Sequence, residues 1–234
     1  MKPERYAEMG RKMEYRHELK FQVTLMELEK IKYRLEPVLT YDSHQDGDFY
    51  TVRSLYFDDM YDSCLFENES GVGSRAKYRI RIYNGNLDLI HLEKKYKEQE
   101  LTRKKREEIS LEECQALILE GEMDGQGTLA KEFAYKMQSK GMGPKCIVEY
   151  DRCALVNEVG NVRVTFDMNI RGCAHPEIFL GDSPEYFDDA MPPNMHILEI
   201  KYDELLPRHI LQAVDLNTLQ RQAVSKYCLV RGRY

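Results

Sequence analysis

The stretch Arg75–Tyr83 reads R-A-K-Y-R-I-R-I-Y, which places Arg75, Lys77, Arg79 and Arg81 at a strict spacing of two residues. Successive side chains of a β-strand point to opposite faces, so these cations share one face and the apolar residues share the other. Like charges on one strand face repel each other, so the row needs either water or a polyanion beside it. The stretch therefore has two interpretations: a solvated outer face above a packed core, or the wall of an anion-binding site.

Charged residues alternate in the same way in other segments, which favours the second interpretation. These segments are Tyr15–Val23 with Arg16, Glu18 and Lys20; His91–Lys95 with Glu93; Cys146–Ala154 with Arg152; Val162–Arg171 with Arg163; and Ile197–Lys201 with Glu199. A closed antiparallel sheet whose charged faces converge on a central cavity would explain all of them. We therefore expect one cavity to be faced by Lys20, Arg79, Glu93, Arg152, Arg163 and Glu199.

The overall charge limits the kind of partner. The chain has 34 Lys and Arg against 40 Asp and Glu, a formal net charge of -6, so a generally basic nucleic-acid binder is not indicated and we expect no nucleic-acid partner. The acidic stretches Asp42–Asp48, Asp58–Asp62 and Gly181–Asp189 are expected as outer loops, which leaves the cations concentrated at an inner site. Such a site suits a small, densely charged anion.

Cysteine and histidine usage argues against disulfides and zinc. The six cysteines form no C-x-x-C pair, and the six histidines show no metal-binding spacing, so we interpret the cysteines as reduced and structural. No apolar run approaches the length of a membrane span, and the first 20 residues are too charged for a signal peptide. We expect a cytoplasmic protein in which residues 1–234 form one domain.

The order of the expected elements predicts an α+β fold. Helices are predicted over Leu25–Leu39, over Ser110–Leu119 after a capping box, over Thr128–Lys140, and in a tail that begins near Pro207. Strands lie between them, two of them joined by a hairpin turn at Asn84-Gly85-Asn86. Arg103–Ile109 is interpreted only as a highly charged stretch. Strands separated by turns, with helices bunched between them, are typical of α+β and not of alternating βαβ units.

Seven short motifs follow one another in a familiar order. They are R-x-E-x-K at Arg16–Lys20, S-L-Y-F-D at Ser54–Asp58, K-Y-R-I-R at Lys77–Arg81, L-E-K-K at Leu92–Lys95, Y-D-R at Tyr150–Arg152, L-E-I-K at Leu198–Lys201 and S-K-Y at Ser225–Tyr227. Together they resemble the VTC (vacuolar transporter chaperone) domain, a polyphosphate polymerase of the triphosphate tunnel metalloenzyme, or CYTH-like, superfamily. The resemblance covers nearly the whole chain. It implies an eight-stranded antiparallel tunnel-like β-barrel with accessory helices and a C-terminal helix.

The resemblance also implies a function and a set of site residues. The implied activity is transfer of the γ-phosphoryl group of ATP to a growing polyphosphate chain, so ATP and inorganic polyphosphate are the expected partners. Because the chain has no membrane span of its own, a separate membrane protein is a further candidate partner. The residues expected to bind phosphate are Lys20, Lys77, Arg79, Arg81, Lys95, Arg152, Arg163 and Lys201. Catalytic roles are expected for Arg79, Arg81 and Lys226.

A divalent metal is the expected cofactor. Glu199 is the first candidate ligand for Mn²⁺ or Mg²⁺, since these hard cations take oxygen ligands, and Glu18 and Glu93 are the next candidates. The alternative for Glu199 is an internal ion pair with a tunnel cation. The alternative for Lys226 is an ordinary solvated lysine on a helix.

One position separates two branches of the superfamily. The first strand of the hydrolytic members carries a motif like E-x-E-x-K. This chain has Arg16 at the first position of that motif, as the polymerase branch does. Exchanging an acid for a cation removes a metal ligand and adds a phosphate contact, which favours synthesis over hydrolysis. A metal-dependent triphosphatase and a non-catalytic polyphosphate-binding module remain as alternatives.

Overall fold

The computed structural model describes residues 16–45, 47–99, 101–181, 183–215 and 219–234. One antiparallel sheet runs through it in the order β1-β10-β8-β7-β3-β4-β5-β6, with the short strands β2 and β9 at its side. The strands are β1 (His17–Thr24), β2 (Thr40–Tyr41), β3 (Tyr50–Asp58), β4 (Ser74–Tyr83), β5 (Asn86–Glu98), β6 (Leu101–Ile109), β7 (Gly143–Asn157), β8 (Val162–Cys173), β9 (Asp188–Asp189) and β10 (Met195–Tyr202). The predicted α+β class and the eight-stranded antiparallel path are confirmed.

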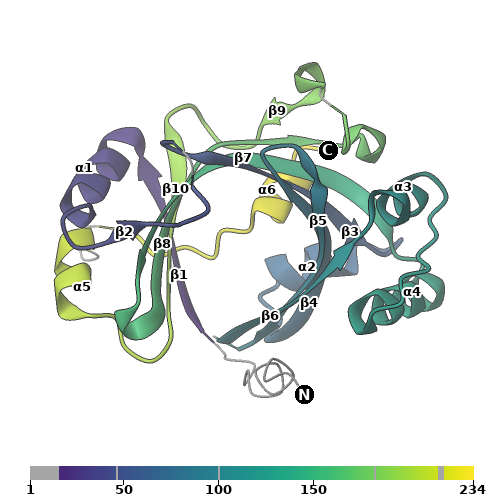
Figure 1. Cartoon of the computed structure of the whole chain (residues 1–234), viewed down its shortest axis with the longest axis horizontal. Coiled ribbons are helices and arrows are strands. Elements are labelled where there is room, and N and C mark those ends of the chain that lie inside the picture. Colours follow the sequence, from purple (N-terminus) through teal and green to yellow (C-terminus); the bar gives the residue numbers. More distant parts are fainter. Residues whose placement is uncertain (1–15, 46, 100, 182, 216–218) are drawn as a thin grey trace, which may run out of the picture.

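The sheet curls until its two outer strands meet, as Figure 1 shows. Strands β1 and β6 are joined by an isolated bridge at Arg16 and Thr102, whose reciprocal N–H to O=C bonds measure 3.2 and 3.3 Å. The remaining strand neighbours form longer ladders, with register shifts between β3 and β7, β4 and β5, and β7 and β8. The expected barrel therefore has the right number and direction of strands, but its last seam is one bridge long in the described residues.

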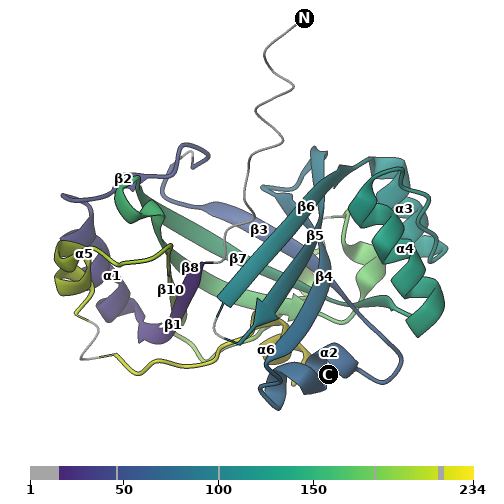
Figure 2. The same ribbon diagram turned by 90° about the horizontal axis from the view of Figure 1, so that it is seen from below.

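Helices cover the outside of the curled sheet. They are α1 (Leu25–Leu35), α2 (Ser63–Glu69), α3 (Leu111–Leu119), α4 (Thr128–Lys140), α5 (Arg208–Val214) and α6 (Lys226–Arg231). In Figure 1, α1 and α5 lie beside β1, β8 and β10, while α3 and α4 lie outside β5 and β6. Figure 2 shows α2 and α6 together at one end of the barrel. Capping boxes at Thr24 and Ser110 fix the starts of α1 and α3.

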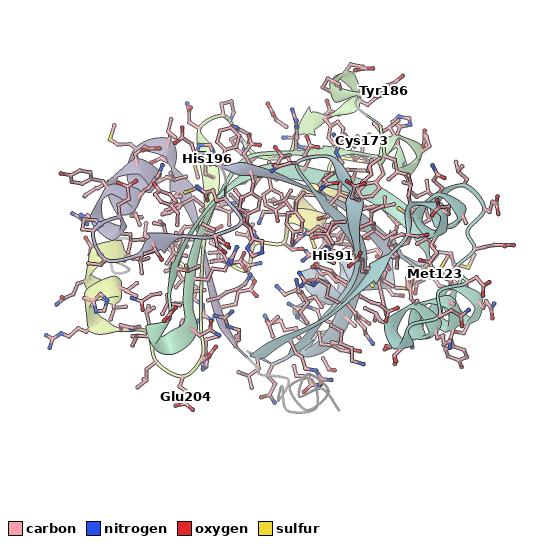
Figure 3. All side chains as sticks on the ribbon, in the orientation of Figure 1. His91, Met123, Cys173, Tyr186, His196 and Glu204 are labelled. Atoms are coloured by element: carbon pink, nitrogen blue, oxygen red, sulfur yellow. The ribbon has the colours of Figure 1, made fainter. Side chains whose placement is uncertain are left out.

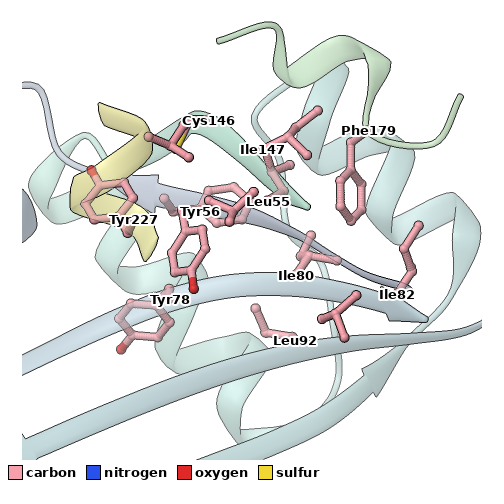
Figure 4. Close-up of a cluster of buried hydrophobic side chains, with 14 of the residues drawn as sticks. Leu55, Tyr56, Tyr78, Ile80, Ile82, Leu92, Cys146, Ile147, Phe179 and Tyr227 are labelled. Atoms are coloured by element: carbon pink, nitrogen blue, oxygen red, sulfur yellow. The ribbon is translucent and has the colours of Figure 1, made fainter. Parts of the chain in front are cut away.

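The hydrophobic core lies on the outer face of the sheet, under these helices. Tyr78, Ile80 and Ile82 of β4 are buried (Figure 4). Tyr78 stacks on Phe133 of α4 with ring centroids 4.9 Å apart. A second cluster joins β1, β8 and β10 to α1 and α5. Because the apolar rows pack outward, the charged rows face inward. The interpretation of Arg75–Tyr83 as a solvated outer face is therefore wrong.

Several sequence expectations need correction. The charged stretch Arg103–Ile109 is part of strand β6, in which few apolar residues mark a buried face. Asp42 and Asp58 are buried and do not belong to solvated outer loops. The first helix ends at Leu35, four residues before the predicted end. Tyr15, the predicted start of the first strand, lies outside the described residues.

No helix in the described part of the chain combines the length and the hydropathy that crossing a membrane would require.

Helix α6 is fastened to the barrel by a buried carboxylate. Asp58 ends β3 and accepts hydrogen bonds from the backbone N–H groups of Cys64 and Leu65, at the start of α2. Its second oxygen also accepts the hydroxyl of Tyr227 on α6, at 2.7 Å. Gly172 of β8 lets the same helix approach closely, because a Cβ there would lie 2.3 Å from a methyl group of Val230.

We predict that Gly172→Ala displaces α6 and lowers the free energy of unfolding by about 1–3 kcal/mol, as overpacking does in other cores. Gly143→Ala is the matched control, because nothing lies within 4 Å of a Cβ at that position. Urea unfolding of both variants measures the difference. Equal stabilities for the two variants would show that the contact with Val230 does not restrain the helix.

Candidate functional site: a cation-lined tunnel

Two adjoining cavities occupy the interior of the barrel. The first, of about 590 Å³, is bounded by residues 221–226 and 228. We call this C-terminal segment the strap and this cavity the strap-side cavity. The hairpin-side cavity, of about 850 Å³, is bounded by Asn84 and Asn86 of the β4–β5 turn, with Tyr50, Tyr83 and Arg163. Both cavities are lined by a common ring of residues: Glu18, Arg79, Arg81, Lys95, Thr102, Arg152 and Lys201. Figure 3 shows side chains from opposite walls pointing into this space, with His91 at its edge.

The wall formed by β3, β4 and β5 holds two arginines around one carboxylate. Glu93 is fully buried and binds Arg79 at 2.7 Å, while Arg81 lies 3.7 Å from the same oxygen. Tyr56 and Tyr150 accept hydrogen bonds from Arg79 and Arg81, at 2.9 and 3.3 Å. Although burial opposes ionisation, the arginines hold the pKa of Glu93 well below its ordinary value. Both guanidinium groups are thereby fixed in place before any ligand arrives.

The opposite wall, formed by β1 and β10, pairs two carboxylates with three lysines. Lys95 reaches across the tunnel to both oxygens of Glu18, at 2.8 and 2.9 Å. Lys20 lies 2.8 Å from Glu18 and 4.0 Å from Glu199, and Lys201 lies 3.0 Å from Glu199. Burial opposes the charge of both acids, but the lysines lower the pKa of Glu199 well below its ordinary value. In the structure Glu199 therefore forms ion pairs with tunnel cations, as the alternative to a metal-ligand role predicted.

A further buried carboxylate, Asp167 of β8, connects the C-terminal helix to the tunnel wall. It accepts two hydrogen bonds from Arg152, at 2.6 and 2.8 Å, and one from Lys226 at 2.5 Å. The side chain of Lys226 is only 9% exposed and lines the strap-side cavity. Its interpretation as a solvated helix lysine is therefore wrong.

Lys77 differs from these cations because its hydrogen-bond partner is neutral. Its Nζ donates to the hydroxyl of Ser225, which also caps α6, at 2.8 Å. No carboxylate in the described part of the chain forms an ion pair with it. Burial lowers the pKa of Lys77 to about 8. An anion in the cavity would supply the missing countercharge.

Most of the residues expected to converge do so, but not all on one surface. Lys20, Arg79, Arg152 and Glu199 line the strap-side cavity, and Arg163 lines the hairpin-side cavity. Arg163 is held there by an ion pair with Asp42 and by the hydroxyl of Tyr50. Glu93 is fully buried behind the arginines.

Arg16, expected to contact phosphate, forms an ion pair with Asp203 at 3.0 Å and lines the hairpin-side cavity.

The structure adds tunnel residues that the sequence reasoning missed. Lys104 of β6 binds Glu93 at 2.6 Å, and Asp167, Tyr56 and Tyr150 hold tunnel cations. Lys104 belongs to a stretch without an apolar row, so alternation gave no signal for it. Asp167 alternates with Arg163 on β8, and its spacing to that residue could have identified it.

The acids present suit a metal that is held mainly by its substrate. Among the described residues, no group of three or more His, Cys, Asp or Glu is arranged to hold a metal ion. Glu18 and Glu199 are nevertheless two carboxylates around one ammonium group, that of Lys20. Mg²⁺ and similar ions are commonly bound by one or two carboxylates together with phosphate oxygens and water. The tunnel therefore fits a metal that arrives with a phosphate ligand.

Comparison with known families agrees with this geometry. The model of the VTC domain matches residues 15–231. The chain belongs to the VTC domain family. Membership in this family, together with the tunnel geometry, supports a phosphoryl-related function for this VTC domain. A search of curated protein sequences found no significant match.

Solved structures of low sequence identity share the fold. A candidate adenylate cyclase from Bacillus halodurans is 13% identical, with a TM-score of 0.51 over 88% of this chain and 89% of the other. A candidate adenylate cyclase from Vibrio parahaemolyticus is 10% identical, with a TM-score of 0.50 over 93% and 98% of the two chains. At these identities the likeness concerns the fold alone.

We predict that phosphate binding to this VTC domain draws protons into the tunnel near pH 8. Because the pKa of free Lys77 is about 8, half of its side chains are neutral at that pH, and a bound anion favours the charged form. Tripolyphosphate affinity should therefore fall as pH rises above 8. Titration calorimetry at pH 8 in buffers of different ionisation enthalpy measures the proton uptake.

Lys77→Arg is the informative variant, since an arginine stays charged at this pH. It should take up about half a proton less than the wild type at pH 8. Burial also lowers the pKa of Lys104 to about 8 and that of Lys95 to about 7, so some uptake should remain in the variant. Unchanged uptake in Lys77→Arg would mean that Lys77 does not face the bound anion.

Proposed function

We propose that this VTC domain is an ATP-dependent polyphosphate polymerase, which transfers the γ-phosphoryl group of ATP to a polyphosphate chain inside the tunnel. The observation that carries the proposal is the charge of the strap-side cavity. Eleven Lys and Arg side chains and three Glu side chains line it, although the whole chain carries a net charge of -6. A cavity of this kind favours an anion with several charges in a small volume.

The shape of the tunnel favours a linear anion. The strap-side and hairpin-side cavities adjoin across a ring that contains Arg79, Arg81 and Arg152. A phosphate chain held at this ring has space on both sides, so a product longer than its substrate can be accommodated. The two cavities, of about 590 and 850 Å³, are too small to enclose a nucleic-acid duplex.

Phosphoryl transfer depends mainly on positioning and on electrostatic stabilisation, and the tunnel residues suit both. Arg79 and Arg81 can fork onto non-bridging oxygens from one wall, since Glu93 fixes their orientation. Lys20 and Lys201 face them from the wall opposite, toward which Lys95 of β5 extends. Lys226 approaches from α6, which places a cation at the side of the reacting phosphates.

Two features favour synthesis over hydrolysis. The first is Arg16. The hydrolytic branch of the superfamily has an acidic residue at this position, so the tunnel lacks one metal ligand that those enzymes would use. The second is the space on both sides of the ring, which a growing chain needs and a triphosphate does not.

Glu199, with Glu18 beside it, would hold Mn²⁺ or Mg²⁺ on the phosphates. The ion would neutralise charge that develops on the phosphate oxygens.

Incubation with ATP and Mn²⁺, followed by gel separation of the products, tests the proposal. We expect phosphate chains much longer than triphosphate, because the tunnel can hold a chain on both sides of the ring. Free phosphate without long chains would assign the domain as a triphosphatase. Tight binding of tripolyphosphate without any turnover would make it a polyphosphate-binding module, and neither result is compatible with a polymerase.

We predict that Glu199→Gln lowers polymer synthesis by roughly a hundredfold or more, since a metal contributes several kcal/mol to stabilising transition-state charge. Binding of metal-free tripolyphosphate in chelator should be kept or strengthened, because the variant removes a carboxylate that repels the ligand. Glu69→Gln is a control, since Glu69 also lines the strap-side cavity. If Glu199→Gln synthesised polymer at the wild-type rate throughout a manganese titration, Glu199 would be a structural ion-pair partner and not a metal ligand.

A further inference from the structure

Two tyrosine hydroxyls lie among the tunnel arginines. Tyr56 of β3 receives a hydrogen bond from Arg79 at 2.9 Å, and Tyr150 of β7 receives one from Arg81 at 3.3 Å. Both side chains are buried, with exposures of 7% and 3%, and both line the strap-side cavity. As acceptors these hydroxyls hold the two arginines, and no contact with a ligand has yet been assigned to them.

The direction of these two hydrogen bonds follows from the chemistry of the groups. A guanidinium group has five N–H donors and no acceptor, so the phenol oxygen must accept in each pair. The proton of each hydroxyl is then directed elsewhere. Among the described residues, neither Tyr56 nor Tyr150 donates this proton to an acceptor. Two unused donors are therefore left in a cavity that suits acceptor-only oxygens.

Packing holds both rings in place. Figure 4 shows Tyr56 beside Tyr227 of α6. The two rings stack, with centroids 5.2 Å apart and an angle of 28° between the planes. The ring of Tyr150 has the Arg152 guanidinium 5.1 Å and the Lys226 ammonium 4.6 Å from its centroid. The hydroxyls are thus preorganised, and binding a ligand would cost them little further ordering.

We propose that Tyr56 and Tyr150 bind the phosphate chain directly, each donating its hydroxyl proton to a non-bridging oxygen. This inference rests on the proposed function and names two further ligand contacts in the same tunnel. Each tyrosine then connects an arginine to a phosphate through consecutive hydrogen bonds, which polarise and strengthen one another. Neutral donors add affinity without adding to the mutual repulsion of the cations.

A different role must be distinguished from this one. Tyr56 could act only by holding Arg79, in which case its loss would loosen a charged phosphate contact. Charged contacts are weakened by salt, so losing one lowers the salt dependence of binding. A hydroxyl carries no charge, and losing it as a direct donor weakens binding equally at every salt concentration. The slope of log Kd against log salt therefore separates the two roles.

The experiment measures tripolyphosphate binding in chelator by titration calorimetry over a series of NaCl concentrations. Tyr56→Phe removes the hydroxyl and keeps the ring that stacks on Tyr227. We expect affinity about tenfold or more below wild type at each concentration, with the wild-type slope. Lys77→Met should lower both the affinity and the slope. Tyr78→Phe is the matched control and should bind as wild type does, because its hydroxyl donates to Glu132 on the outer face.

Each outcome bears on a definite claim. Wild-type affinity in both Tyr56→Phe and Tyr150→Phe overturns the inference, and so does a reduced slope in these variants, since the tyrosines would then act through the arginines. A wild-type domain that does not bind tripolyphosphate overturns the proposed function and this inference with it. Thermal unfolding of each variant verifies the fold, and Tyr150→Phe serves as the second measurement should Tyr56→Phe unfold.

Discussion

The structure depends on the mutual neutralisation of charges inside the barrel. Glu93, Asp167 and Glu199 are buried and Glu18 is half-buried, and each of the four contacts at least two tunnel cations. Buried ion pairs seldom stabilise a fold more than apolar packing would, because both charges lose their hydration. Their value here is geometric, since they keep a row of arginines and lysines extended into an open cavity. An anion that enters the tunnel can compete with the carboxylates for cations that are already in position.

The charged interior determines where the hydrophobic core must lie. In a small closed barrel the interior is ordinarily filled by apolar side chains, but here that space is polar. The apolar rows of the strands consequently face outward, and they need helices to cover them. Helices α3 and α4 cover one wall, and α1 and α5 cover the other. The accessory helices are thus a requirement of the tunnel and contribute to the site without touching it.

Alternation along the strands was sufficient to predict much of this arrangement. Arg75–Tyr83 has a clear cationic face and a clear apolar face, and its strand lies where the pattern placed it. Strand β6 was not found, because Leu101–Ile109 has charged residues on both faces and lies at the edge of the sheet.

Asp58 and Asp42 were misplaced for a different reason. Their burial depends on partners far away in the sequence: the hydroxyl of Tyr227 for Asp58 and the guanidinium of Arg163 for Asp42. Local composition contains no information about such partners.

The seam between β1 and β6 has a further consequence for how the protein behaves in solution. One bridge joins these strands in the described residues, so most of the outer backbone of β6 has no strand beside it. Exposed strand edges invite pairing with other chains, and that pairing leads to aggregation. Strand β6 carries the run Arg103-Lys-Lys-Arg-Glu-Glu108, and charged side chains, lysine above all, discourage such pairing. The charged composition that gave no alternation signal for this strand therefore also disfavours edge-to-edge pairing of the incompletely closed barrel with its copies.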